Sequence, residues 1–330
     1  MIINDMKRIS IYVPQSAVIE SISPPYRLFK MANELLAASG QKPLFEVEYI
    51  GQRKVIEAND GEYMVKMNRL LSEVRHTDLV IIPALYGNMR EAVQINYMAV
   101  PWLQELHQSG TEIASLCLGA FLLGATGLVN QKQCSTHWAY CREFKELYPE
   151  VEVVEGSIIT DEGNIYSSGG ANSIWNLLLY LLEKYTDRNI AIMAAKYFAI
   201  DIDRNSQGAF MIFSGQKDHQ DSEILKTQEF IEQNYADRHT IEDLASQINV
   251  SRRSFERRFK QATNNTVIEY IQRVRIESAK RSFEASRKNV SEVMYEVGYT
   301  DTKAFRDVFK RVTGLTPVEY RNKYSRMIKN

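Results

Sequence analysis

One cysteine stands where an apolar run gives way to a pattern of small residues, and a histidine follows it along the chain. The apolar run is 112–116, Cys117 ends it, and a helical pattern begins at Gly119. The dipole and free N–H groups of a helix N-terminus lower the pKa of a nearby thiol. Together with His137, which lies 20 residues further on, Cys117 meets the minimum requirement for an activated sulfur nucleophile.

A structural role competes with this hypothesis. A cysteine after a buried strand is usually a small core residue, and a single histidine usually has an ordinary packing role. The spacing of Cys117 and His137 alone therefore favours structure over catalysis. Cys134 and Cys141 lack further ligands at usable spacing, so we expect neither a metal site nor a cofactor.

The last part of the chain carries a different pattern, made of short basic helices. The whole chain has a net charge of −1, yet residues 251–330 hold 19 Lys and Arg against 9 Asp and Glu. In 240–260 an apolar helical pattern ends at a tight break, and Ser251 is placed to cap a second, basic helix. The same order recurs about fifty residues later, in 290–311, with Thr300 or Asp301 as the cap. Two short helices joined by a tight turn, the second one basic, predict a helix-turn-helix unit.

Two such units on one connector suit double-stranded DNA. A basic helix fits the major groove, where Arg and Lys donate to guanine edges and phosphates. Two of them can enter successive grooves, which lie ~34 Å apart on one face of the duplex. The alternative is an ordinary helical bundle with solvated charges, and the matched caps, breaks and aromatic pairs of the two units favour DNA binding over it.

The elements around these residues predict two domains. Alternating strand and helix patterns, with strands at 8–13, 44–50, 78–83 and 112–116, favour an α/β doubly wound, flavodoxin-like domain. Strand signals stop after residue 186. We therefore expect an N-terminal α/β domain, a linker and an all-α C-terminal domain, listed in order as 1–202, 203–220 and 221–330.

Composition limits the remaining possibilities. The chain has 330 residues, of which 45% are hydrophobic and 25% charged, so it is expected to fold rather than to be disordered. Three cysteines do not make a disulfide framework and suit a reducing compartment. The start lacks a signal core, and the uncharged run at 113–129 is too short and polar to span a bilayer. We expect a cytoplasmic protein without a membrane partner.

Residues 222–325 resemble the AraC/XylS-type DNA-binding domain, most specifically through the string GLTPVEYR at 314–321. Leu244, Ala245, Arg275 and Tyr270 also match. The resemblance implies sequence-specific binding to double-stranded promoter DNA, often as a homodimer and often with activation. The residues expected to contact DNA are Ser251, Arg252, Arg253, Glu256, Arg257, Arg258, Thr302, Lys303, Arg306 and Lys310, among which Arg258 is expected to be structural or to meet a phosphate.

Residues 7–185 resemble the ThiJ/PfpI superfamily, which has the class I glutamine amidotransferase-like fold. Cys117 with Gly119, Thr136 with His137, and Ser168 with the two following glycines carry this resemblance. This domain fused to an AraC-type domain is the architecture of the GlxA-like transcriptional regulators. The resemblance implies a bacterial, nucleoid-bound regulator with a small-molecule effector.

Two parts of the superfamily's catalytic site are missing from the pattern. Glu20 is the nearest candidate acid, but counting back from Phe29 places Ser21 at the family's acidic position. The glycine pair expected after Pro83 for oxyanion donors is absent, since Gly87 comes late. The interpretation that follows is a former catalytic pocket that binds an effector and is not an enzyme. Its expected lining is Cys117, Leu118, His137, Tyr86 and Gly87.

Two alternatives stay open. The chain could be a cysteine-dependent enzyme with a DNA-binding domain, of an amidase, isonitrile hydratase or glyoxalase-like type, using Cys117, His137 and Glu20. It could also sense oxidants through Cys117, since a thiolate at such a turn oxidises readily.

Overall fold

The computed structural model describes residues 6–201, 207–217 and 219–325. They divide into two compact units, Met1–Gln207 and Gly208–Asn330.

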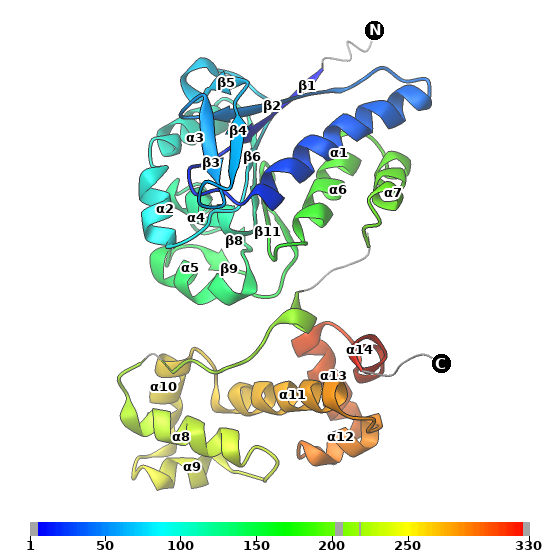
Figure 1. The fold of residues 1–330 in the computed structure, drawn as a ribbon. Coiled ribbons are helices and arrows are strands. Elements are labelled where there is room, and N and C mark those ends of the chain that lie inside the picture. Colours follow the sequence, from blue (N-terminus) through cyan, green and yellow to red (C-terminus); the bar gives the residue numbers. More distant parts are fainter. Residues whose placement is uncertain (1–5, 202–206, 218, 326–330) are drawn as a thin grey trace. The chain divides into compact units, whose positions relative to one another are not determined.

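The N-terminal unit is built on a seven-stranded sheet in the order β10-β11-β7-β6-β1-β2-β5 (Figure 1). Neighbouring strands are parallel except for the pair β10 and β11. The doubly wound α/β prediction is therefore confirmed. The strands are β1 (Lys7–Tyr12), β2 (Phe45–Gly51), β5 (Arg69–Leu70), β6 (Leu79–Ile82), β7 (Glu112–Leu116), β10 (Ile159–Asp161) and β11 (Ile165–Ser168), with two small additional sheets formed by β3 (Val55–Ala58) with β4 (Tyr63–Lys66) and by β8 (Gln133–Cys134) with β9 (Glu152–Val153).

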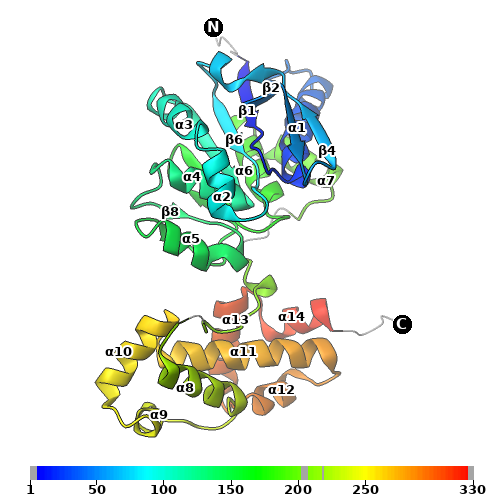
Figure 2. The same cartoon turned by 60° about the vertical axis from the view of Figure 1, so that its left-hand side comes forward.

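Helices cover both faces of this sheet because its central strands are apolar on both sides. All four residues of β6 are buried, and they alternate between two apolar clusters. One face packs on α1, α6 and α7, and the other on α2, α3, α4 and α5 (Figures 1 and 2). Their bounds are α1 (Ile19–Ala38), α2 (Met89–Ile95), α3 (Ala99–Gln108), α4 (Ala120–Ala125), α5 (Cys141–Leu147), α6 (Ile174–Tyr185) and α7 (Arg188–Tyr197).

The segment between β6 and β7 forms two helices, α2 and α3, and not one continuous helix. Asn96 lies between them and is fully buried. Its side-chain oxygen accepts from the Tyr12 hydroxyl (3.1 Å) and its amide nitrogen donates to Ala92 O (2.8 Å). The chain turns here because the Asn96 side chain bonds to β1 and α2 at a point where a continuous helix would form backbone hydrogen bonds.

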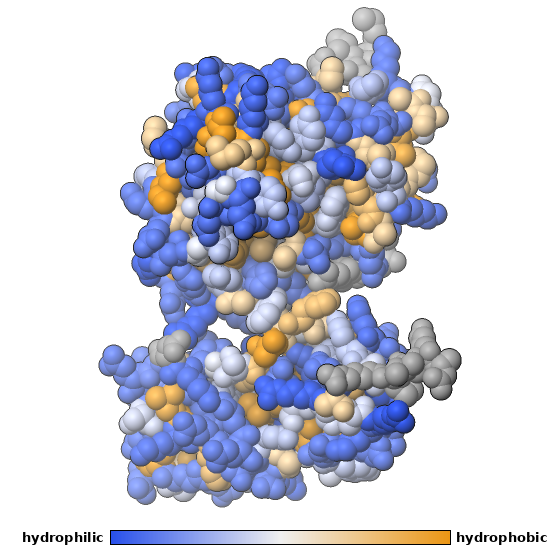
Figure 3. Space-filling model, viewed as in Figure 1, coloured by the Kyte–Doolittle hydropathy of each residue, from blue (hydrophilic) through white to orange (hydrophobic). Residues whose placement is uncertain are grey.

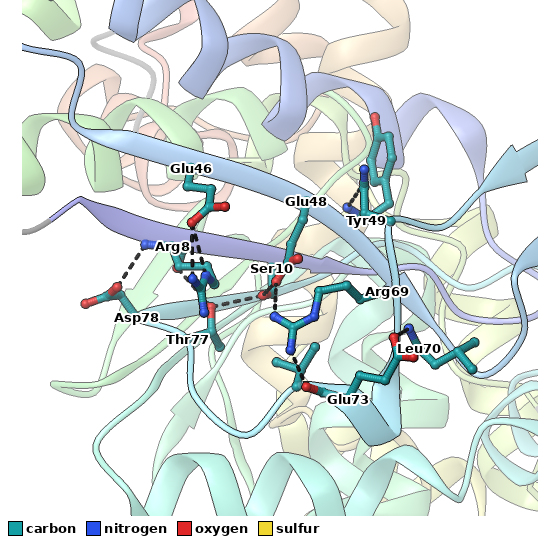
Figure 4. A network of polar contacts seen from close by, with 12 residues as sticks. Arg8, Ser10, Glu46, Glu48, Tyr49, Arg69, Leu70, Glu73, Thr77 and Asp78 are labelled. Carbon is teal, nitrogen blue, oxygen red and sulfur yellow. Dashed lines mark hydrogen bonds and ion pairs between the residues drawn. The ribbon is translucent and has the colours of Figure 1, made fainter.

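A polar network joins the strands β1 and β2 to the segment before β6 (Figure 4). The Ser10 hydroxyl lies 3.1 Å from Glu48 Oε1 and 3.0 Å from Thr77 Oγ1. Arg69 reaches the same Glu48 carboxylate at 3.5 Å. Because every buried member of this group has a partner, these polar residues are compatible with burial between strands.

The C-terminal unit consists of helices arranged around the long helix α11 (Figures 1 and 2). Two apolar clusters fill it, one centred on Phe255, Phe259 and Tyr270 and the other on Phe305, Phe309 and Tyr320. The helices are α8 (Ser222–Gln233), α9 (Ile241–Gln247), α10 (Arg252–Thr263), α11 (Val267–Ala285), α12 (Val290–Glu296), α13 (Thr302–Thr313) and α14 (Pro317–Tyr324).

The structure differs from the predicted linker over 203–220. Residues 203–206 and 218 lie outside the described residues, while 208–217 pack on the C-terminal unit. The Phe213 N–H donates to Glu277 (3.2 Å), and the Phe213 ring meets Tyr270 at 5.2 Å between centroids. Lys280 Nζ, which is buried, donates to Met211 O and contacts Glu277 at 2.9 Å. This packing has no local signal in the sequence, because the partners of the segment are charged side chains of α11, far along the chain.

The surface drawn in Figure 3 is mainly hydrophilic, with apolar side chains in small patches. Within the described residues, no helix combines the length and apolar character that crossing a bilayer requires.

Candidate functional site

Both predicted helix-turn-helix units are present, as α9 with α10 and α12 with α13. A side-chain oxygen caps each helix. Thr240 accepts from the Asp243 N–H (3.1 Å) and Ser251 from the Ser254 N–H (3.3 Å). In the second unit Asn289 and Asp301 do the same, so Asp301 rather than Thr300 caps α13. Each cap satisfies an N–H that would otherwise lack a partner, which explains why four short helices are stable side by side.

The same hydroxyl arrangement closes both units. The Thr263 hydroxyl contacts Phe259 O (2.7 Å) and Asn265 O (3.2 Å). Fifty residues later the Thr313 hydroxyl contacts Phe309 O (2.8 Å) and Leu315 O (3.0 Å). The internal duplication seen in the sequence is therefore a duplication of structure down to single hydrogen bonds.

Two of the basic side chains predicted on α10 face other parts of the protein. Arg258 forms two bonds to Asp221, at 2.9 and 2.7 Å, and one to Glu223 at 2.8 Å. Arg252 pairs with Glu242 (2.6 Å) and Glu256 (3.4 Å) while remaining exposed. Arg258 thus anchors α10 on the N-terminal end of α8.

The remaining cations of α10 point to solvent. Arg253, Arg257 and Lys260 are exposed. Across the described residues their side chains form neither a hydrogen bond nor an ion pair. Arg257 and Lys260 border a surface hollow of about 630 Å³ that continues to Val267 and Ile268.

Helix α13 presents its own row of exposed polar and basic residues. Thr302, Lys303, Arg306 and Lys310 are exposed, and none of the three cations has a side-chain partner in the part of the chain that the structure describes. All four line a hollow of about 480 Å³. Unpaired cations along one helix provide what a phosphate backbone or a guanine edge needs from a protein.

Arg275 fixes the two units to the same connector. From α11 its guanidinium donates to Tyr235 O (2.7 Å) and Asp237 O (2.8 Å), in the segment that leads to α9. It also donates to Gly298 O (3.1 Å), in the turn of the second unit. A planar group with several donors can hold three carbonyls at once, so Arg275 ties segments of both units to α11.

The turn at Cys117 has the geometry expected after β7. Cys117 has φ of +53°, a value that non-glycine residues rarely adopt. Gly119 passes so close to β6 that an added Cβ would lie 2.6 Å from Pro83 O. The Cys117 N–H donates to Ser168 Oγ (3.4 Å), and the Thr136 hydroxyl donates to Cys117 O (3.2 Å).

The surroundings of the thiol oppose its ionisation. Cys117 is 6% exposed, and burial raises its pKa to about 12. His137 is half-buried, burial lowers its pKa, and its Nδ1 accepts from the Ala139 N–H at 3.2 Å. Among the described residues no hydrogen bond joins His137 to Cys117. Desolvation therefore outweighs the effect of the helix N-terminus.

Glu20, the candidate acid of the enzyme alternative, lies at the surface. Glu20 is exposed and approaches Asn59 Nδ2 at 3.5 Å. The buried residue of this turn is Ser21, whose hydroxyl accepts the Ala84 N–H at 2.9 Å. This bond uses an N–H next to Pro83, in the segment where hydrolases of the fold place oxyanion donors.

The other predicted pocket residues are spread over this edge of the sheet. Leu118 is half-buried and packs on the apolar clusters of both sheet faces. Tyr86 is 50% exposed and its N–H donates to Ser16 O (2.7 Å). Gly87 has φ of +85° and open space around it.

Two residues of interest were missed by the sequence-based prediction. Lys260 was left out of the DNA-contact set, although its counterpart fifty residues later, Lys310, was included. The repeat would have identified it. Gln207 is a fully buried polar residue beside Gly169 and Gly170, and its burial had no signal in the sequence.

The chain was compared with known families and proteins. Residues 8–184 match the DJ-1/PfpI family, and residues 244–323 match a helix-turn-helix domain family. The HTH-type transcriptional regulator GbdR of Pseudomonas aeruginosa is 24% identical over 255 residues, which cover 74% of this chain and 66% of GbdR. The HTH-type transcriptional regulator GlxA of Rhizobium meliloti is 22% identical over 67% of this chain and 68% of its own length.

The solved structure of Drosophila melanogaster DJ-1beta has the same fold as the N-terminal unit. It aligns with a TM-score of 0.50 and 14% identity, covering 59% of this chain and 99% of its own. Both resemblances predicted from the sequence are confirmed. The chain belongs to the DJ-1/PfpI family and carries an AraC-type helix-turn-helix domain after its α/β domain.

Proposed function

We propose that this chain is a sequence-specific DNA-binding transcriptional regulator that responds to a small metabolite bound by its N-terminal domain. The observation that carries the proposal is the pair of helix-turn-helix units, each with exposed and unpaired cations on its second helix. The names of the relatives GbdR and GlxA agree with it. In a bacterial cell such a protein acts in the cytoplasm, on the nucleoid.

Each domain has its own part in this function. Residues 1–202 hold the effector and form the homodimer, and 221–330 bind promoter DNA. The segment 203–220 transmits the signal, and its described part, 208–217, moves with the C-terminal unit because it is packed there. The effector acts by favouring one arrangement of the DNA-binding domains over another.

In this proposal the turn at Cys117 helps to bind the effector and does not catalyse a reaction. A buried thiol with a raised pKa, and a histidine that forms no hydrogen bond to it among the described residues, do not make an activated nucleophile. Iodoacetamide should therefore modify Cys117 slowly throughout the neutral range, with a rate that keeps rising to the highest pH at which the protein stays folded. Mass spectrometry of the Cys117 peptide measures this rate at each pH. An inflection of the rate near neutral pH would instead support the cysteine-dependent enzyme or the oxidant sensor.

The DNA-binding proposal is tested by incubating the purified chain with fragments of its source genome at two salt concentrations. We expect a few fragments to remain enriched at the higher salt, because base contacts survive screening better than phosphate contacts. Uniform binding that disappears with salt would contradict sequence specificity. Arg27→Ala is the control variant and should enrich the same fragments, since Arg27 is an exposed arginine of α1 in the other unit.

The homodimer is tested by light scattering on the chain eluting from a sizing column. A mass of twice 38.0 kDa is expected without DNA, and a mass of one chain would restrict dimerisation to the DNA-bound state.

A further inference from the structure

The side chain of Gln207 is bound inside the N-terminal unit in the way a ligand would be. It is 1% exposed. Its Nε2 donates to Ser157 O (2.7 Å) and to Thr136 O (3.3 Å), and its backbone N–H donates to Gly156 O (2.7 Å). The donor end of one carboxamide therefore meets two backbone carbonyls in a closed, polar site.

The acceptor end of the same carboxamide is unsatisfied. Gln207 Oε1 has no hydrogen-bond partner within the described residues, and neither has the buried Ser173 Oγ. A Cβ at Gly170 would lie 2.9 Å from each of these two oxygens. Ser173 precedes the twelve-residue helix α6, so the wall opposite the two carbonyls combines a hydroxyl with a helix N-terminus. A buried oxygen without a hydrogen-bond partner is unfavourable, so a better-fitting group can compete for this site.

The backbone around the site is shaped to make room for an amide. An added Cβ at Gly169 would collide with Gln207 Nε2 and lie 2.6 Å from Thr136 O. Thr136 also bonds the Cys117 carbonyl through its hydroxyl, and Ser168, just before the two glycines, accepts the Cys117 N–H. The Gln207 site therefore adjoins the turn at Cys117.

The residues that follow Gln207 lie against both helix-turn-helix units. An added Cβ at Gly208 would lie 2.7 Å from Val312 O, at the end of α13. Ala209 belongs to the apolar cluster of the second unit, and Phe213 packs on that of the first. Along the chain, one peptide bond separates the buried carboxamide from a segment that contacts both DNA-binding units.

We propose that the Gln207 site is the effector site, that it takes a ligand with a primary carboxamide, and that the ligand acts by replacing the Gln207 side chain. A primary amide supplies two N–H donors for the carbonyls of Thr136 and Ser157 and an oxygen for the Ser173 hydroxyl. A carboxylate would place oxygen lone pairs against both carbonyls. Release of Gln207 frees the start of segment 208–217. This change alters the arrangement of the DNA-binding units. This inference rests on the proposed regulatory function, since its output is DNA binding.

Ligand binding is tested by thermal unfolding of the full chain with propionamide or propionate as probes. In Gln207→Ala the site is vacated, and we expect saturating propionamide to raise its melting temperature by about 2 °C or more. The shift should be smaller in the wild-type chain, whose own side chain competes, and propionate should cause none.

Gln104→Ala is the matched control, because Gln104 lies in the same unit and its amide also donates to a backbone carbonyl, Thr126 O, at 2.8 Å. A propionamide shift of equal size in all three proteins, or none in Gln207→Ala, overturns the site. Gln207→Glu guards against a folding defect, since it keeps the size of the side chain and removes the amide donors. It should show the same increased response to propionamide relative to the wild-type chain.

Coupling is tested by the affinity of each variant for a DNA fragment enriched from the genome. Gln207→Ala and Gln207→Glu should differ from the wild-type chain by about fivefold or more in the same direction, and Gln104→Ala should not. Unchanged affinity in both Gln207 variants overturns the coupling even if the chain binds DNA specifically. If the wild-type chain binds no fragment specifically, the regulatory function fails, while the melting experiment still decides the site.

Discussion

From the caps Ser251 and Asp301 onward, equivalent residues of the α9–α10 unit and the α12–α13 unit lie fifty positions apart. The two units differ in which of these residues are polar. Phe255, Phe259 and Tyr270 have their counterparts in Phe305, Phe309 and Tyr320, and all six are buried. On the exposed face the match ends. Glu256 corresponds to Arg306, and Arg257 corresponds to Asp307.

The position after this pair is equally informative. Arg258 corresponds to Val308, which is 7% exposed. In the first unit an ion pair with α8 does what an apolar side chain does in the second. The comparison indicates that core and caps keep the fold of the two units alike, while the charges of their exposed faces differ.

The turns differ in the same way. Asn249 and Asn264 hold the left-handed positions of the first unit, with φ of +54° each. Gly298 and Gly314 hold them in the second, with φ of +80° and +77°. Both residue types tolerate this conformation, but only glycine also permits a close backbone approach.

The largest effect is expected from Gly298→Ala. An added Cβ would be strained at positive φ and would collide with Ala236 O, a backbone atom that cannot swing away. We expect the free energy of unfolding of the C-terminal unit to fall by about 3 kcal/mol or more. Urea unfolding followed by far-ultraviolet circular dichroism measures it.

Asn249→Ala is the control for this prediction, because it adds strain at positive φ without the glycine's close contact. It should cost about 1 kcal/mol. Equal losses in the two variants would show that the close approach to Ala236 has no energetic weight.

Arg257→Ala and Arg306→Ala compare the two exposed faces. Each should weaken binding to an enriched fragment by about 1–3 kcal/mol and relax specificity in a different half of the site. Fluorescence anisotropy with fragments altered in one half at a time measures both effects. If only one variant loses affinity and specificity, base recognition belongs to one unit alone.

Arg258→Ala should instead affect stability. The bonds from Arg258 are the main cause of the lowered pKa of Asp221, and a partly exposed pair of this kind contributes about 1 kcal/mol. Because the pKa of Asp221 is lowered by folding, this contribution is present above the ordinary value of 3.8 and is lost as the pH falls through the folded-state value.

The difference in unfolding free energy between the wild-type chain and Arg258→Ala should therefore shrink in acid. Affinity for DNA should stay within about twofold, measured at a temperature where both proteins are folded. A loss comparable to that of Arg257→Ala would place Arg258 on the DNA.

The smallest effect is expected from Asn264→Gly, which gives the first unit the residue of the second. Asn264 is exposed and already left-handed, so the unfolding free energy should change by no more than about 0.5 kcal/mol. A change above 1 kcal/mol in urea unfolding would mean that the two closing loops are not equivalent.

Much of the fold was predictable because its signals are local. The caps at Thr240 and Ser251 and the aromatic pairs of α10 and α13 follow from helical spacing and capping chemistry. The alternating apolar runs predicted the doubly wound sheet for the same reason. Two other features were not predictable, because they depend on distant partners. Asn96 breaks a helix by bonding β1, and residues 211–213 are held by the buried Glu277 and Lys280.

The sequence by itself determined the two-domain order, the fold of each domain and the repeated helix-turn-helix pattern, since periodicity, caps and motifs act over a few residues. Only the tertiary structure decided the surroundings and partners of the residues whose side chains could bind or react. Burial raised the pKa of Cys117, α8 engaged Arg258, and the end of the N-terminal unit placed Gln207 inside a polar site. These outcomes depend on desolvation and on partners far along the chain, which no short stretch of sequence contains.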